Sequence, residues 1–175
     1  NDWFYDTGTN AQSVAVSADG EYIAAGSWDD KVYLFSKDNS TPLWSYTTDD
    51  NVDTVAMSAD GEYIVSGSYD GKKIYLFERD SSTPLWNYST GGGVSTVAIS
   101  ADGEYIVAAS KGSTSDRKVY LFDKDSSTPL WSYSTSGHVD SVAISLDGEY
   151  IAANSRKVYL FHKDGSTPLW NYSTG

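Results

Sequence analysis

Residues 58–77 read Ser-Ala-Asp-Gly-Glu-Tyr-Ile-Val-Ser-Gly-Ser-Tyr-Asp-Gly-Lys-Lys-Ile-Tyr-Leu-Phe, and variants of this stretch recur along the chain. The pentapeptide Asp-Gly-Glu-Tyr-Ile occurs four times, starting at Asp19, Asp60, Asp102 and Asp147. Each copy is followed by an aliphatic-Tyr-Leu-Phe segment and then by Pro-Leu-Trp. The chain is therefore an array of four related units, and its architecture follows from what one unit can form.

One unit predicts four short strands, which we call a, b, c and d. In the second copy they cover residues 52–58, 62–68, 73–78 and 85–89, and they are rich in Val, Ile, Tyr, Phe and Trp. The Asp-Gly pair between strands a and b predicts a two-residue hairpin, because both central positions of such a turn require positive φ. Strand c is apolar on both faces, which suits a sheet buried between two others, whereas the Pro at the start of strand d suits an outer edge.

A repeat of about 42 residues with four strands is typical of a β-propeller blade. The sequence therefore predicts an all-β fold of four antiparallel, four-stranded blades over residues 9–48, 49–90, 91–135 and 136–175. Residues 1–8 match the end of strand d and predict an additional, leading outer strand.

The ends of such an array need cover. A lone arc of four blades leaves two apolar blade faces bare, so we expect these blades to be part of a seven- or eight-bladed ring. A second copy of the chain or further repeats would close that ring. The chain starts at Asn1 rather than Met, which indicates either a processed product or a window on a longer array.

The Ser-Ala-Asp-Gly-Glu-Tyr-Ile segment, followed by Ser-Gly-Ser-Tyr-Asp-Gly at 66–71, resembles the WD40 repeat family. Strand d departs from that pattern, and its Pro-Leu-Trp-Asn-Tyr wording within 80–91 is similar to quinoprotein-type (PQQ-like) repeats. The Gly-His pair of WD40 repeats occurs once, at Gly137-His138, and no strand c ends in Trp-Asp. The resemblance spans the whole chain. Its near-identical repeats resemble those of archaeal and environmental propellers of the secreted or surface type. It implies the propeller fold and no particular activity, because propellers carry many unrelated functions.

The composition of the chain excludes several classes of binding partner and of chemistry. The chain has 175 residues, with 24 acidic and 12 basic side chains and a formal net charge of −12. Nucleic acids and anionic membranes need clustered Lys and Arg, so neither is an expected partner. The absence of Cys excludes disulfides and thiolate chemistry. No apolar run approaches the roughly 18 residues of a membrane span, so no insertion is expected.

In a propeller the a–b and c–d links share one rim. We call it the constant rim because the sequences of these links are nearly the same in all four copies. The b–c and d–a links share the other, the variable rim, which differs in every copy. Function usually lies on loops held by a rigid scaffold, so the variable rim is the predicted binding face. Drift after duplication is the alternative explanation. The candidate ligand-binding residues are Trp28, Asp29, Asp50, Tyr69, Asp70, Lys111, Arg117 and His138.

Trp28 and Tyr69 occupy equivalent positions beside a turn. Their rings could stack on a sugar or a peptide, or they could pack on a neighbouring loop. These two alternatives stay open at the level of sequence.

No catalytic constellation emerges. His138 and His162 are expected on opposite rims, where they cannot form a pair, and no Ser lies in a nucleophile-elbow motif. The acidic loops at Asp29-Asp30 and at 49–53 match no known calcium-binding repeat. We therefore expect no enzymatic activity, no metal and no cofactor.

The sequence favours a non-enzymatic recognition or scaffold module that binds a protein or carbohydrate partner through the variable rim. One alternative is a structural subunit of an extracellular layer or filament, and another is a fragment of a quinoprotein-like dehydrogenase. Three Asn-X-Ser/Thr sequons, at Asn39, Asn87 and Asn171, are candidate glycosylation sites and favour an extracellular or cell-surface location.

Overall fold

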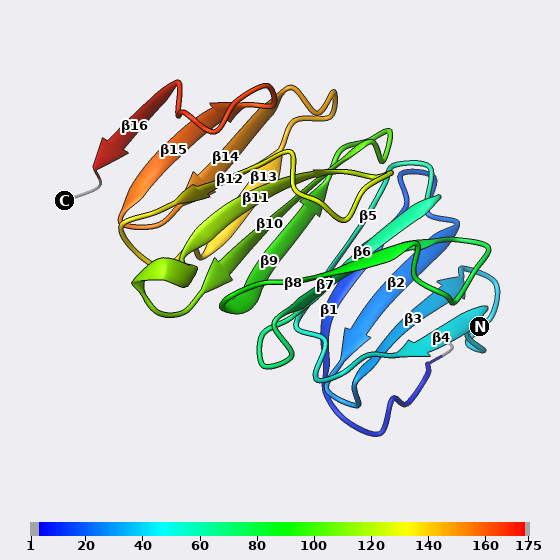
Figure 1. Cartoon of the computed structure of the whole chain (residues 1–175). Coiled ribbons are helices and arrows are strands. Elements are labelled where there is room, and N and C mark those ends of the chain that lie inside the picture. The colour runs from blue at the N-terminus through cyan, green and yellow to red at the C-terminus, as the bar shows by residue number, and fades with distance from the viewer. Residues whose placement is uncertain (1–3, 174–175) are drawn as a thin grey trace.

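The computed structural model describes residues 4–173, which fold into four antiparallel, four-stranded sheets. In each sheet the strands lie in chain order, so each strand pairs with its neighbours in sequence. The predicted all-β fold of four-stranded antiparallel blades is therefore confirmed. We number the blades 1 to 4 along the chain. Figure 1 shows them side by side, with blade 1 and blade 4 at opposite ends.

Blade 1 contains β1 (Ala11–Val16), β2 (Tyr22–Ser27), β3 (Lys31–Ser36) and β4 (Trp44–Thr47). Blade 2 contains β5 (Thr54–Met57), β6 (Tyr63–Ser68), β7 (Lys73–Glu78) and β8 (Trp86–Ser89). Blade 3 contains β9 (Gly93–Ile99), β10 (Tyr105–Lys111), β11 (Lys118–Asp123) and β12 (Trp131–Ser134), with a 3-10 turn at Thr114–Asp116. Blade 4 contains β13 (Ser141–Ile144), β14 (Tyr150–Asn154), β15 (Lys157–His162) and β16 (Trp170–Ser173). Over residues 4–173 no helix is long and apolar enough to cross a bilayer.

The a–b link is not the two-residue hairpin that the Asp-Gly pair predicted. Five residues, 17–21, separate β1 from β2, and Gly20 has positive φ (75°) whereas Asp19 does not. Asp19 Oδ1 instead accepts hydrogen bonds from Ser17 Oγ (2.6 Å) and from the Glu21 N–H (2.9 Å). The Asp is therefore a turn-stabilising acceptor rather than a second left-handed residue. The same network recurs around Asp60, Asp102 and Asp147.

The outer strand of each blade packs on strand c of the next blade. The Trp44 ring of β4 lies 5.4 Å from the Phe77 ring of β7, and the Trp44 Nε1–H donates to the Arg79 carbonyl across 2.6 Å. A Trp is thus both an apolar contact and a hydrogen-bond donor to the next blade, so it can be buried without leaving its N–H unsatisfied. Trp86 and Trp131 repeat both contacts at the next two junctions.

The predicted leading outer strand, 1–8, lies partly outside the described residues, and residues 4–8 form no strand. A strand needs a neighbouring ladder, and within the described residues no preceding blade supplies one. Tyr5 nevertheless packs on Tyr33 and Phe35 of β3, with ring centroids 5.4 Å from each. This is the place that Tyr46 of β4 takes on β7 of the next blade.

Candidate functional site

The variable rim is one continuous edge of the array. The Thr48 N–H and hydroxyl, just after β4, both donate to the Asp30 carbonyl in the β2–β3 link, at 2.7 and 2.9 Å. The d–a and b–c links of one blade are thus bonded together. Val52 extends this edge to the neighbouring blade, because its N–H donates to the Ser27 carbonyl across 3.0 Å. The b–c and d–a links of blade 1 therefore meet on one rim, as strand order predicts, and the neighbouring blade is bonded to it.

Trp28 and Tyr69, from adjacent blades, meet at a single carboxylate. Trp28 Nε1 donates to Asp53 Oδ1 across 3.1 Å, and the Tyr69 N–H donates to Asp53 Oδ2 across 2.6 Å. Both side chains stay 44% exposed. The Tyr69 ring also lies against Gly93 at the start of β9, where an added Cβ would be 2.6 Å from Tyr69 Cδ2. Each residue is therefore anchored to a neighbouring loop and still presents surface to solvent.

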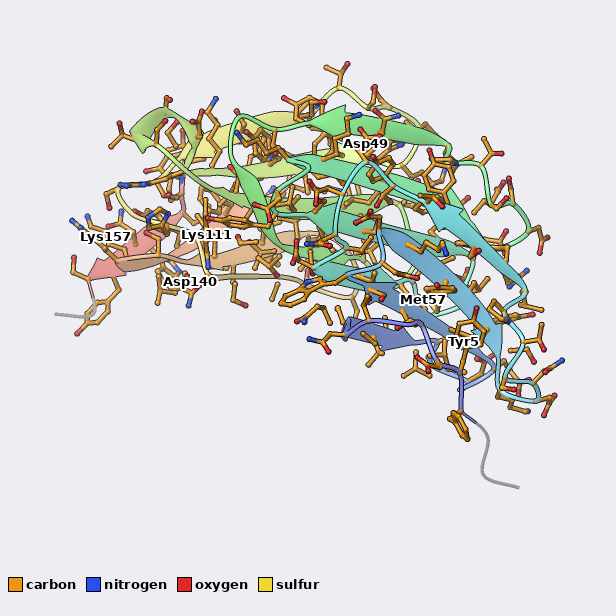
Figure 2. The ribbon with its side chains drawn as sticks, turned by 90° about the horizontal axis from the view of Figure 1, so that it is seen from below. Tyr5, Asp49, Met57, Lys111, Asp140 and Lys157 are labelled. Carbon is orange, nitrogen blue, oxygen red and sulfur yellow. The ribbon has the colours of Figure 1, made fainter. Side chains whose placement is uncertain are left out.

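A second link of the same kind joins blades 3 and 4. Lys111 Nζ lies 2.8 Å from Asp140 Oδ1, and Figure 2 shows the two residues on neighbouring segments. Lys111 directly follows a strand-b Ser, as Trp28 does, and Asp140 directly follows a buried Val, as Asp53 does. The candidate Lys111 is therefore an inter-blade contact of this rim.

The other candidates are not gathered around these rings. Asp29 accepts a hydrogen bond from the Tyr33 hydroxyl, and burial together with this carboxylate raises the pKa of Tyr33. Asp50 Oδ1 accepts from the Asn51 N–H at 2.8 Å, so it stabilises its own turn. Arg117 Nε donates to the Gly112 carbonyl across 3.2 Å and closes the β10–β11 loop. Asp70 and His138 are exposed.

Sequence reasoning missed Asp53 and Asp140 as site residues. The available signal was positional: each follows a buried Val that precedes strand a, at Val52 and Val139, whereas Ser95 takes that position after Val94. Only two of these copies have an acidic residue at this position, and each one contacts a different partner, so the sequence contains no motif here. The contacts form only where two blades pack together.

The constant rim has a structural reason to be constant. The Ala18 N–H donates to the Ala59 carbonyl (2.8 Å), Ala59 repeats this bond to Ala101 (2.9 Å), and Ala101 repeats it to Leu146 (3.0 Å). Basic side chains of the c–d links add contacts here, such as Arg79 over the Tyr22 ring and 2.7 Å from Glu62. Replacing these basic side chains would remove contacts between blades, such as Arg79 over Tyr22 and Lys163 over Tyr105, so the constancy of this rim does not by itself make the other rim a binding face.

A shallow groove on the constant rim lies between blades 3 and 4 and is lined in part by Tyr105, Trp131 and Lys163. Its polar groups are already engaged: Trp131 Nε1 donates to the Lys163 carbonyl, and Lys163 Nζ lies 2.7 Å from Glu149. This groove is therefore better explained as part of the blade junction.

Among residues 4–173 no three His, Asp or Glu side chains gather as metal ligands would. His138 lies in the β12–β13 link and His162 at the end of β15, so the two lie on opposite rims. His162 Nε2 lies 3.2 Å from Glu149 and its Nδ1 lies 3.3 Å from Asp164, both on the constant rim.

The three sequon asparagines are exposed. Asn39 lies in the β3–β4 link, where its Oδ1 accepts from the Thr41 N–H at 2.9 Å. Asn87 and Asn171 lie on the outer strands β8 and β16.

The comparisons with known proteins identify a family but no activity. The model of a protein family described as "Family of unknown function (DUF5711)" matches residues 6–166. No curated protein matches the chain.

Proposed function

We propose that this chain, which belongs to the DUF5711 family, is a non-enzymatic recognition module that binds a protein or carbohydrate partner through its variable rim. The observation that carries the proposal is the pair of half-exposed rings, Trp28 and Tyr69, held on either side of Asp53. Aromatic rings with one free face are a common means of contacting sugars and peptides.

The anchoring of these rings favours binding over mere exposure. Trp28 is held by its ring N–H, and Tyr69 is held by its backbone and by contact with Gly93. A side chain that is already ordered loses little conformational entropy when a ligand covers it. Both oxygens of Asp53 already accept protein hydrogen bonds, so its role here is to position the rings.

The kinship and location proposed with this function rest on the sequence. We assign the blades to a WD40-like or PQQ-like lineage because of the Ser-Ala-Asp-Gly and Pro-Leu-Trp segments. We place the protein outside the cell or at its surface because the sequons at Asn39, Asn87 and Asn171 are exposed. Loss of mass after glycosidase treatment of the protein from its natural source would support this location, and an unchanged mass would count against it.

A second candidate function is a structural subunit of an extracellular layer or filament. The observation in its favour is that the two ends of the blade array carry exposed apolar side chains, among them Val14 and Tyr172. Repeated end-to-end contacts would then build an open assembly.

The binding function is tested by applying the labelled chain to a glycan microarray and to a peptide microarray. Trp28→Ala and Tyr69→Ala should each lower the signal of any hit by about tenfold or more, which corresponds to a lost hot-spot contact. Leu85→Ala is the matched control, because Leu85 is half-exposed but lies on the constant rim. The proposal is wrong if neither array gives a hit, or if the control lowers the signal as much as the two rim variants.

A further inference from the structure

The two ends of the array carry the two sides of an interface that the chain builds three times internally. Strand a of each blade presents a Val towards the preceding blade: Val55 is 7% exposed, Val97 6% and Val142 8%. The equivalent Val14 in blade 1 is 71% exposed, and Val16 beside it is 60% exposed. Along β1, blade 1 therefore lacks the cover that a preceding blade gives to the other blades, and we call this face the head.

Blade 4 has the opposite bare face, which we call the tail. Tyr172 of β16 is 69% exposed, whereas its equivalents Tyr46, Tyr88 and Tyr133 pack on the next blade. The same holds for Trp170, whose equivalents are half-buried donors to the following blade. The tail thus carries the residues that elsewhere cover a head.

The hairpin glycines show the same fit. A Cβ on Gly61 would lie 2.9 Å from Tyr22 of the preceding blade, and one on Gly148 would lie 2.5 Å from Tyr105. Gly20 on the head has nothing within 4 Å among the described residues. The tail offers the missing ring, because Tyr150 follows the same hairpin position in blade 4 and is half-exposed.

The backbone completes the complementarity. The series of hydrogen bonds along the constant rim starts at Ala18 and ends at the Leu146 carbonyl. Within residues 4–173 the Leu146 N–H has no acceptor and the Ala18 carbonyl has no donor. One more bond of the same kind, from Leu146 of a tail to Ala18 of a head, would continue the series. Each end of the array thus has an exposed apolar face, with an open donor on the tail and an open acceptor on the head. The tail of one copy therefore matches the head of another copy.

We propose that a second copy of this chain docks its tail on the head of the first and its head on the tail of the first, closing a ring of eight blades. The two junctions are identical and related by a two-fold axis, and each reproduces the internal blade junction. The ring places the Trp28 and Tyr69 sites of both copies on one rim, although the proposal does not depend on any ligand.

The segment before β1 must move for this docking. Tyr5 occupies the position on Tyr33 and Phe35 that Tyr172 of the second copy takes in the ring. Residues 4–8 form no strand, whereas β16 is bonded to β15 along its length. β16 therefore replaces Tyr5, and Tyr5 acts as a weak competitor of association.

The test is the mass of the chain in solution by native mass spectrometry and light scattering at about 1–100 μM. The chain should have twice its 19.0 kDa mass. Val14→Asp and Tyr172→Asp should each give monomers, because each places a charge in both junctions. Leu85→Asp, at a half-exposed Leu away from both ends, should stay dimeric. Since Val14 and Tyr172 are exposed within one chain, both variants should keep the far-ultraviolet spectrum and thermal transition of a folded monomer.

Mixing the two monomeric variants separates this docking from others. Val14→Asp retains its tail and Tyr172→Asp retains its head, so the mixture should form a heterodimer through one intact junction. Tyr5→Ser should tighten association. A monomeric wild-type chain, masses that grow beyond two copies, a dimer that survives Val14→Asp, or no heterodimer from the mixture would each overturn the ring. Weaker association of Tyr5→Ser would overturn the seating of β16.

Discussion

Trp28 Nε1 donates to Asp53 Oδ1 across 3.1 Å and so joins the β2–β3 link of blade 1 to the start of β5 in blade 2. The corresponding positions at the junction of blades 3 and 4 hold the Lys111–Asp140 ion pair. The repeat therefore keeps the place of the contact while its chemistry changes from a neutral ring N–H to an ammonium group. Because the proposed binding rings are also contacts between blades, stability and binding should respond together to changes at Asp53.

Asp53→Ala removes the acceptor of two hydrogen bonds, one from Trp28 and one from Tyr69. We expect a loss of about 1–2 kcal/mol in the free energy of unfolding, from about 1 kcal/mol per bond. Urea denaturation followed by tryptophan fluorescence measures this loss. The matched control is Asp140→Ala, which removes an exposed ion pair and should cost less than about 1 kcal/mol. Equal losses in the two variants would show that the shared carboxylate is not what holds the rings.

The hairpin glycines provide a second matched pair. Gly20 and Gly148 both have positive φ, at 75° and 72°, so an Ala at either position suffers backbone strain of about 1–2 kcal/mol. An Ala at Gly148 additionally meets Tyr105 at 2.5 Å, which adds about 1–3 kcal/mol of overpacking. Gly148→Ala should therefore lower the unfolding free energy more than Gly20→Ala does.

This comparison must be made in the Val14→Asp background, because in the ring Gly20 would itself face Tyr150 of the second copy. Without Val14→Asp, in the dimeric ring, Gly20→Ala and Gly148→Ala should lower the unfolding free energy by similar amounts. Identical unfolding midpoints in the monomeric background would contradict the packing of Tyr105 on the hairpin.

The strands could be predicted from the sequence because each one is identified by its composition and by its place in the repeat. Strand c of the second copy was predicted at 73–78 and is β7, Lys73–Glu78. Strand a was predicted to begin at Val52 but begins at Thr54, because the Val52 N–H bonds to Ser27 of the preceding blade. The end of a strand is set by its neighbour in space, and a pattern within one strand does not contain that information.

The a–b hairpin and the candidate site likewise depend on contacts that the pattern of one strand does not contain. The Asp-Gly pattern predicts two left-handed residues, but the Ser17 hydroxyl two positions earlier donates to Asp19, which acts as an acceptor instead. The variable rim could be located from strand order, and with it Trp28 and Tyr69. Asp53, which holds them, could not, because its two partners come from different links and meet it only after two blades have packed.

The hairpin carboxylates predict a loss of stability in acid. Burial opposes ionisation of Asp102, but hydrogen bonds from the Ser100 hydroxyl and the Glu104 N–H outweigh it and hold its pKa below the ordinary 3.8. The Ser17 and Ser145 hydroxyls lower the pKa of Asp19 and Asp147 in the same way. The folded state then binds fewer protons than the unfolded state, so this stability is complete above the unfolded pKa. It is lost as the pH falls through the folded pKa.

Unfolding free energies measured by urea from about pH 7 to about pH 3 should therefore fall at the acid end of this range. Asp102→Asn keeps an acceptor oxygen and cannot titrate, so its stability should fall less steeply in acid than that of the wild type. A parallel acid dependence in the two proteins would assign the loss to other carboxylates.

The dependence of association on ionic strength is a further test of the proposed ring. Each chain carries a net charge of −12, so two copies repel each other at low salt, whereas the head and tail meet through Val14, Val16, Trp170 and Tyr172. Raising sodium chloride from about 0.05 M to about 1 M shortens the Debye length to about 3 Å and removes most of that repulsion. The apolar junction is not weakened by the same change, so the dimer should dissociate at a lower protein concentration in high salt. Sedimentation equilibrium at both salt concentrations measures this shift, with Leu85→Asp as a control that should follow the wild type. Weaker association in high salt would mean that ion pairs hold the copies together, and apolar head-to-tail docking would then be the wrong geometry.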